Sequence, residues 1–143
     1  MADITHFAGE YRWLSNFAPS EVRLDDVTYP TVEHAYQAAK TLDKEERLRV
    51  QVETNPNGAK AQGYRLTLRK DWEQVKLSVM YDLLLQKFSI AAYAEKLLAT
   101  EDALLVEGNT WHDTYWGVCE GKGFNHLGQL LMMIRQYIRE EYY

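Results

Sequence analysis

The sequence predicts an α+β fold, with a single compact, mostly helical domain and a few short strands. The chain has 143 residues, which is the usual size of one domain with its own core. No repeat and no linker rich in Pro, Gly or Ser divides it, so one domain is expected over residues 1–143. Helix caps, alanine-rich segments and apolar stripes of helical period outnumber the strand patterns.

In the first part of the chain, residues 5–17 suggest a short strand followed by a loop. Residues 22–24 and 27–29 flank Asp25-Asp26, and this pattern predicts a tight hairpin. Thr31 is a good N-cap, so a helix is expected over residues 31–40, where three alanines favour it.

Further helices and two strands are expected along the rest of the chain. The turn sequence at residues 55–58 should stop one helix, Asp71 and Gln74 have the spacing of a capping box, and Asn125 can cap the last helix. The expected helices are 44–53, 59–64, one that starts after Asp71, 91–99 and one that starts after Asn125; the expected strands are 104–106 and 115–118.

Composition narrows the classes of function. The formal net charge of −5 disfavours binding to extended nucleic-acid duplexes, because proteins that grip the backbone by bulk charge are usually basic. The single cysteine, Cys119, rules out a disulfide within the chain and is more typical of a small buried hydrophobe than of a nucleophile. With no signal-peptide pattern and no spanning apolar run, a cytoplasmic location and no membrane partner are expected.

The helix over residues 31–40 carries the first candidate site. At about 100° per residue, Glu33, Gln37 and Lys40 share one face, whereas His34 points away and is expected to be structural. Two interpretations stay open at this point. The face is either an exposed acid and base on a solvated surface, or an enclosed site in which Lys40 loses its proton and attacks an aldehyde carbon.

A second polar and aromatic stretch covers residues 107–117. Glu107 and Asp113 are acids in an expected loop, and a carboxylate near an anomeric carbon stabilises the positive charge that develops as a glycosidic bond breaks. The alternative is a Gly-containing turn with a solvated Asp and a core Trp. The residues expected to bind sugar hydroxyls or to stack on a base or sugar are Asn109, Thr110, Trp111 and Trp116.

The third stretch, residues 12–17, places a polar pair between aromatic residues. Arg12 can reach a phosphate, Trp13 or Phe17 can stack on a base, and Ser15 and Asn16 add hydrogen-bonding groups. A folded loop pinned by its two aromatic residues explains the same pattern. The histidines are scattered without ligand spacing, so no metal site is expected.

Taken together and in order, these stretches resemble the NADAR family, also described as YbiA-like or riboflavin-intermediate N-glycosidases. The resemblance spans nearly the whole chain. It rests on residues 13–17, 29–40, 71–80, 107–110 with 113, 116–117, 125–128 and 131–132. His112 stands where a small or variable residue is expected, which bears on substrate choice.

The resemblance implies a mostly helical α+β fold and hydrolysis of N-glycosidic bonds without a cofactor. The implied substrates are small phosphorylated riboflavin-pathway intermediates, or ADP-ribose attached to guanine in nucleotides or nucleic acid. Lys40 matches the lysine thought to form a Schiff base with the opened ribose, and Glu33 matches the acid on the same face. Glu107 and Asp113 match the loop acids; Trp13, Asn16 and Trp116 match pocket walls.

Three hypotheses follow. In the first, Lys40 forms an imine with the sugar and Glu33 or Asp113 moves the protons. In the second, Glu33 or Asp113 activates water directly and Lys40 only holds phosphate, so Lys40→Arg keeps much of the rate. In the third, the chain binds ADP-ribose or NAD without turnover.

Overall fold

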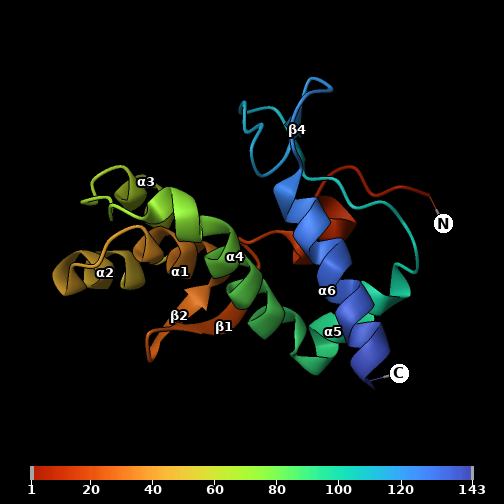
Figure 1. Cartoon of the computed structure of the whole chain (residues 1–143), viewed down its shortest axis with the longest axis horizontal. Helices are drawn as coiled ribbons and strands as arrows, with labels where there is room; N and C mark the ends of the chain where they lie inside the picture. The colour runs from red at the N-terminus through yellow and green to blue at the C-terminus, as the bar shows by residue number, and fades with distance from the viewer. Residues whose placement is uncertain (1, 143) are drawn as a thin grey trace. The chain divides into compact units, whose positions relative to one another are not determined.

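Helices make up most of the described chain, which also has two short two-stranded sheets, β1-β2 and β3-β4 (Figure 1). This confirms the predicted α+β class. The computed structural model describes residues 2–142, which divide into two compact units. The hairpin unit is Asn16–Lys87, and the terminal unit holds the rest of the described chain on either side. A single domain over residues 1–143 stays a prediction.

The hairpin unit begins with the predicted pair of strands. Strand β1 (Pro19–Leu24) runs antiparallel to β2 (Val27–Thr31), with Leu24 opposite Val27. Asp25 and Asp26 between them have φ of 48° and 67°. Two positive φ values in a two-residue loop are what the right-handed strand twist favours, and Asp tolerates them. The hairpin is confirmed, and both strands are longer than predicted.

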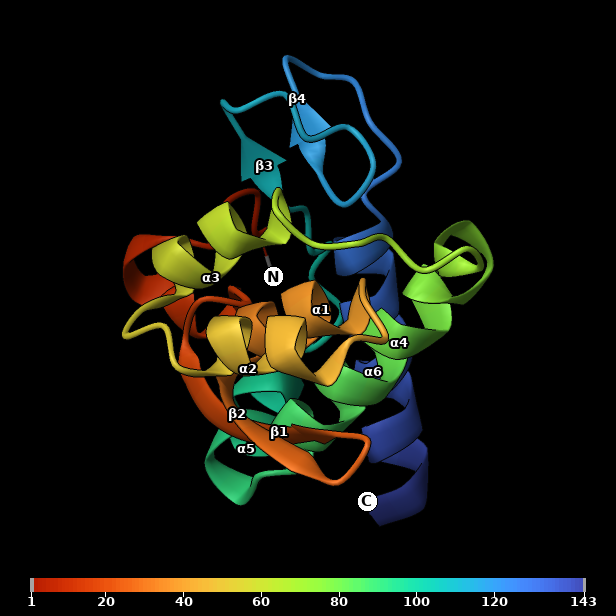
Figure 2. The ribbon, with the colours of Figure 1, turned by 90° about the vertical axis from the view of Figure 1, so that its left-hand side faces the viewer.

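Helix α1 (Val32–Ala39) follows β2 directly. Thr31 caps it as predicted, because its side-chain oxygen accepts a hydrogen bond from the His34 backbone N–H at 3.0 Å. All eight residues of α1 are buried. Its small alanines allow close approach by its neighbours, and Figure 2 shows the hairpin, α2 (Lys44–Gln51) and α3 (Pro56–Gly63) gathered around it.

The helix predicted over residues 44–53 ends at Gln51, ahead of the predicted stop at residues 55–58, and these residues also start α3. The Asn55 side chain accepts from the Gly58 N–H at 2.9 Å, and Pro56 occupies the first turn. Asn before a helix and Pro in its first turn are a start signal, because Pro lacks an N–H that would be unpaired there. The predicted helix over residues 59–64 therefore begins three residues too late.

Helix α4 (Trp72–Phe88) starts where Asp71 predicted, but without the predicted capping box. The Gln74 N–H bonds to the backbone oxygen of Asp71 at 3.0 Å. The Asp71 carboxylate accepts instead from Arg69 Nε at 2.6 Å. The charged guanidinium group of Arg69 is a stronger hydrogen-bond partner for this carboxylate than a backbone amide is.

The terminal unit contains a short 3-10 helix η1 (Gly9–Leu14), then α5 (Ala91–Ala99) as predicted, packed on α6 (His126–Tyr142). Strands β3 (Gly108–Asn109) and β4 (Val118–Cys119) pair in parallel. The strand predicted at residues 104–106 is reduced to a single bridge between Ile4 and Leu105. None of the helices in the described part of the chain is long and apolar enough to cross a membrane.

Two side chains explain the other differences in this unit. Asp113 Oδ1 accepts from the backbone N–H groups of Tyr115 and Trp116, which turns the chain there and moves the strand predicted at 115–118 on to Val118. Asn125 is not the predicted helix cap. Its φ is 52°, and its amide binds the Glu107 N–H and the Leu105 oxygen instead.

Candidate active site

The predicted face of α1 forms an enclosed acid and amide pair. Glu33 is 8% exposed and Gln37 is 4% exposed. Gln37 Nε2 donates to Glu33 Oε2 at 2.6 Å, so the amide holds one carboxylate oxygen in place. The fold positions this pair at the helix start, where Thr31 caps α1 and the Asn16 oxygen accepts from the Glu33 N–H at 3.1 Å. Such burial does not fit a solvated ion pair.

Lys40 lies just beyond the last turn of this helix and is half-buried. Burial lowers the pKa of its amine below the usual 10.5, because the charged form is penalised in a poorly hydrated site. Glu33 acts in the opposite direction and raises the pKa, but it does not outweigh burial. The amine lies 5.3 Å from the centre of the Tyr36 ring. A larger neutral fraction is what a lysine nucleophile requires.

Sequence reasoning missed the role of Gly63, the last residue of α3. A Cβ atom at this position would collide with Gln37 Oε1 and would lie 2.8 Å from Gln37 Cδ. Gly63 therefore gives Gln37 the room to reach Glu33. Gln37 Oε1 is buried and has no hydrogen-bond partner among the residues that the structure describes. In a sequence, a glycine at the end of a helix is interpreted as an ordinary C-terminal signal, so the sequence did not indicate this contact.

A second lysine has a more strongly shifted pKa. Burial lowers the pKa of Lys87 to about 7. Lys87 lies in α4, and it is 0% exposed. A fully buried amine cannot meet a sugar from solution, so Lys40 remains the candidate nucleophile of the hairpin unit.

The loop acids form a second, separate group in the terminal unit. Asn109 is 7% exposed and links them: its Nδ2 donates to Glu107 Oε2 at 3.0 Å and to the Asp113 oxygen at 2.9 Å. Its Oδ1 accepts from the Asp113 N–H at 3.1 Å. The Asn109 side chain therefore holds Glu107 and Asp113 close to each other.

Asp113 is committed in part as well, because its Oδ1 accepts from Tyr115 N at 3.1 Å and from Trp116 N at 2.9 Å. Trp116 is half-buried and packs edge-on against Tyr115, with ring centres 4.9 Å apart. Thr110 is exposed. The loop thus keeps its predicted acids together but uses much of its polar surface on its own backbone.

The predicted residues near the N-terminus divide between the units. Arg12, Trp13 and Ser15 belong to the terminal unit, where Arg12 is exposed and the Trp13 ring lies edge-on to Phe88 at 6.3 Å. Asn16 and Phe17 belong to the hairpin unit. Asn16 is connected to α1, because its backbone oxygen accepts from the Glu33 N–H.

The remaining candidates are structural. His34 is 1% exposed, with Nδ1 2.7 Å from Thr31 Oγ1 and Nε2 3.0 Å from the Glu53 oxygen, which confirms its predicted role. Cys119 is buried, 3.9 Å from His112 Nδ1. Within residues 2–142, no three His, Cys, Asp or Glu side chains are grouped to hold a metal ion.

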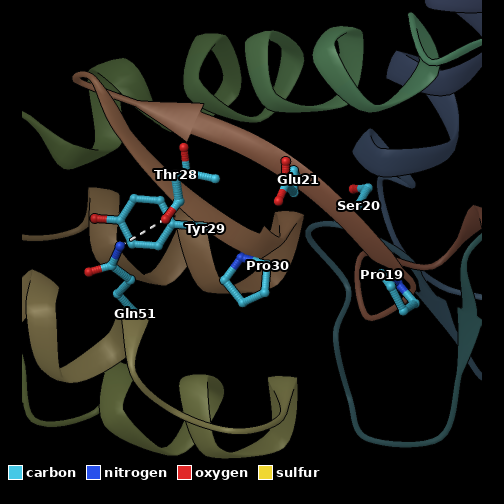
Figure 3. Close-up of a pocket in the computed structure, with 7 residues that line it drawn as sticks. All are labelled: Pro19, Ser20, Glu21, Thr28, Tyr29, Pro30 and Gln51. Carbon is cyan, nitrogen blue, oxygen red and sulfur yellow. Dashed lines mark hydrogen bonds between the residues drawn. The ribbon is translucent and has the colours of Figure 1, made fainter.

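A separate concavity of about 510 Å³ lies on the hairpin (Figure 3). In it Gln51 Nε2 donates to the Thr28 oxygen at 2.9 Å. The seven lining residues contain one carboxylate and no amine; they are Pro19, Ser20, Glu21, Thr28, Tyr29, Pro30 and Gln51. Without an amine, this concavity cannot form the imine that the α1 face can form.

Known proteins are similar to this chain in sequence and in fold. The chain is 42% identical over 136 residues to N-glycosidase YbiA of Escherichia coli, with 92% of this chain and 84% of the relative covered. An N-glycosidase of Nostoc punctiforme is 40% identical, with coverage of 90% and 86%. The NMR structure of Escherichia coli YbiA superposes with a TM-score of 0.85 at 39% identity, covering 97% of this chain and 84% of that chain.

A maize protein named riboflavin biosynthesis protein PYRR is 35% identical over 143 residues, which cover 87% of this chain and 23% of the maize protein. The model of the NADAR domain matches residues 5–139. Similarity of this length and identity confirms the resemblance drawn from the ordered motifs: the chain belongs to the NADAR family.

Proposed function

We propose that this NADAR-family N-glycosidase hydrolyses the bond between C1 of a phosphorylated ribose and an amine, through an imine on Lys40. The observation that carries the proposal is the α1 face, where a half-buried amine of lowered pKa shares a helix face with the buried carboxylate of Glu33. Covalent catalysis at a sugar carbon requires at least a nucleophile and a neighbouring group that transfers protons.

In the first half of the reaction, the neutral Lys40 amine attacks C1 of the ring-opened substrate. The bond from Nζ to C1 forms, and the bond from C1 to the leaving nitrogen breaks. The leaving nitrogen receives one proton from the attacking Lys40 nitrogen and one from Glu33 in its protonated form, so a neutral amine departs. The product on the enzyme is a protonated imine, and the face of the Tyr36 ring stabilises this cation.

In the second half, water adds to C1 of the imine. The ionised Glu33 carboxylate takes a proton from that water, and the bond between C1 and Nζ then breaks. Lys40 is released as an amine and the sugar as an aldehyde, which closes to its ring. One water is consumed for each amine and each reducing sugar released. Gln37 orients Glu33 for both proton transfers.

The remaining assignments are part of the same proposal. Glu107 and Asp113 act as further acids, and the loop that Asn109 organises holds them. Substrate contacts are assigned to the exposed or half-buried side chains of the matched motifs. These are Arg12, Trp13, Ser15, Phe17, Thr110 and Trp116, to which the buried Asn16 is added through its link to Glu33.

Two substrate classes are proposed. Phosphorylated riboflavin-pathway intermediates are supported by the name of the maize relative, a riboflavin biosynthesis protein. ADP-ribosylated guanine, free or in nucleic acid, is supported by the family resemblance. Both place a phosphorylated ribose next to a nitrogen leaving group. A cytoplasmic location suits both, and the single cysteine supports it.

A two-substrate hydrolysis assay tests the proposal. The full chain is incubated with the early riboflavin-pathway intermediates and with ADP-ribosylated guanosine, and the released sugar is measured by chromatography. Release of a reducing sugar from at least one substrate is expected, and it should be absent with Lys40→Met. Binding of ADP-ribose with no product from either substrate would instead favour the module that binds without turnover.

A further inference from the structure

Helix α3 brings a second lysine to the α1 face. Gly63, at the end of α3, lies against the amide of Gln37. Lys60 precedes Gly63 by three residues, so the two lie on the same side of α3. Lys60 is half-buried, as Lys40 is. The contact between Gly63 and Gln37 therefore sets Lys60 on the side of α3 that meets α1.

Helix α4 brings a third lysine to the same place. The Trp72 ring packs against the Tyr36 ring, with ring centres 5.3 Å apart. Lys40 follows Tyr36 by four residues, and Lys76 follows Trp72 by four. Lys40 and Lys76 thus each lie one helical turn along the chain from the contact between the two rings. The Lys76 side chain is 15% exposed and pairs with Glu73, which is itself 72% exposed, at 2.6 Å.

The electrostatics agree with this geometry. The charges of Lys60 and Lys76 both lower the pKa of Lys40, so both act on its amine. They converge in a chain whose formal net charge is −5. Inside the cluster, Glu33 is the buried carboxylate, and Glu73 is at the solvent edge. Converging, half-buried ammonium groups repel one another unless an anion joins them.

A phosphate group suits such a cluster by chemistry. Lysine binds phosphate as a point charge, and a dianion offsets two ammonium groups. Glu33 repels an anion from the Lys40 end of the face, so the anion belongs beside α3 and α4, and the sugar carbon belongs beside Lys40. Glu73 is exposed and can leave Lys76 as a phosphate arrives, because exposed ion pairs are weak.

We propose that Lys60 and Lys76 form the phosphate subsite of the active site, and that they hold the phosphate of the ribose whose C1 meets Lys40. This inference rests on the proposed function, because it assigns the phosphate of the same substrate. The division of labour is specific: Lys40 reacts with the sugar, and the two other lysines bind and orient it. Neither lysine belongs to the residues predicted from the sequence.

Calorimetric titration with ribose 5-phosphate tests the subsite without turnover, and ribose and ADP-ribose serve as comparison probes. Lys60→Gln and Lys76→Gln should each weaken binding of ribose 5-phosphate about 10-fold or more, which corresponds to about 1.4 kcal/mol. Binding of ribose should not change. The matched control is Lys44→Gln, which removes an exposed lysine of α2 in the same unit and should stay within about twofold of the wild type.

Further arms keep the result unambiguous. Lys60→Arg and Lys76→Arg retain the charge and should restore binding, which separates loss of charge from loss of folding. Comparing ribose 5-phosphate with ADP-ribose tells whether the subsite takes a phosphate monoester or a pyrophosphate. The proposal is overturned if ribose 5-phosphate binds no tighter than ribose to the wild type, or if both Gln variants bind it as Lys44→Gln does.

The hydrolysis assay on the same variants separates the two proposals. Phosphate-dependent binding that both Gln variants lose, with no hydrolysis by the wild type, sustains the subsite and contradicts the proposed function. Unchanged hydrolysis of a phosphorylated substrate by both Gln variants would contradict the proposed subsite and would agree with the proposed function.

Discussion

The α1 face and the loop over residues 107–117 are both dense in polar side chains, yet they differ in where those side chains bond. On α1, Gln37 makes one bond to Glu33 and its Oε1 has no partner within the described residues, while Lys40 keeps an amine of lowered pKa. In the loop, Asn109 and Asp113 bond to neighbouring backbone groups. The helix leaves its groups available for chemistry, whereas the loop uses its groups to hold its own shape.

This difference teaches how to read polar residues in such a sequence. A helix satisfies its backbone internally, so side chains on its face are left for other tasks. An irregular loop must find partners for its backbone N–H and C=O groups, and nearby Asn and Asp provide them. Variants of the α1 face should therefore change the rate, and variants of the loop should first change stability.

The largest effect is expected from Lys40→Met. Removing the nucleophile should lower kcat on the order of 10³-fold or more, with an unchanged unfolding midpoint. Lys44→Met is the matched control on α2 and should keep full activity. Lys40→Arg sharpens the test, because an arginine retains the charge but cannot form the imine. If Lys40→Arg keeps much of the rate, direct hydrolysis replaces the covalent mechanism.

Glu33→Gln should lower kcat about 10²- to 10³-fold, as expected for loss of a general acid and base. It should also shift the pH profile. The wild-type rate rises with pH as Lys40 loses its proton, at a pKa below 10.5. Glu33 raises this pKa, so its removal should lower it further and move the acidic limb of kcat/KM to lower pH. A limb that moves to higher pH would contradict the assigned coupling.

Two loop variants should separate structure from charge. Asn109→Ala leaves the backbone N–H and oxygen of Asp113 without their partners and should reduce the free energy of unfolding by about 1–3 kcal/mol. Asp113→Asn keeps an oxygen for the Tyr115 and Trp116 N–H groups, so its stability should change less. Urea unfolding measures both. Equal destabilisation by the two variants would show that the carboxylate itself holds the loop.

The smallest effect is expected from Gly63→Ala, which tests the support behind Glu33. The added Cβ displaces the Gln37 amide and should lower kcat roughly tenfold, with little change in KM. In the double variant Gly63→Ala, Gln37→Ala the collision is gone but the bond to Glu33 is still missing, so kcat should stay low. Full activity of Gly63→Ala would mean that the bond from Gln37 to Glu33 does not matter for the reaction.

Sequence patterns predicted most elements that depend on local signals. The hairpin, α1 with its Thr31 cap and α5 follow from turn residues, capping and helix propensity. Errors arose where one side chain had two possible partners. Asn125 was expected to cap α6 and instead binds residues 105 and 107, which no local pattern can indicate.

The site shows the same limit. The shared face of Glu33, Gln37 and Lys40 follows from helical spacing alone. The pKa of Lys40, which burial lowers and Glu33 raises, does not follow from spacing, because burial depends on how other helices pack against α1. Gly63, Lys60 and Lys76 were missed for a similar reason. They lie on α3 and α4, and their spacing from Lys40 in the sequence carries no signal.

The imine itself is the central claim, and reductive trapping tests it most directly. The wild-type chain is incubated with a substrate that it turns over, sodium borohydride is added, and the protein is digested and analysed by mass spectrometry. A reduced adduct of the sugar on the peptide that contains Lys40 is the predicted result, and it should be absent from Lys40→Arg. Continued turnover with no adduct on Lys40 would contradict the covalent mechanism.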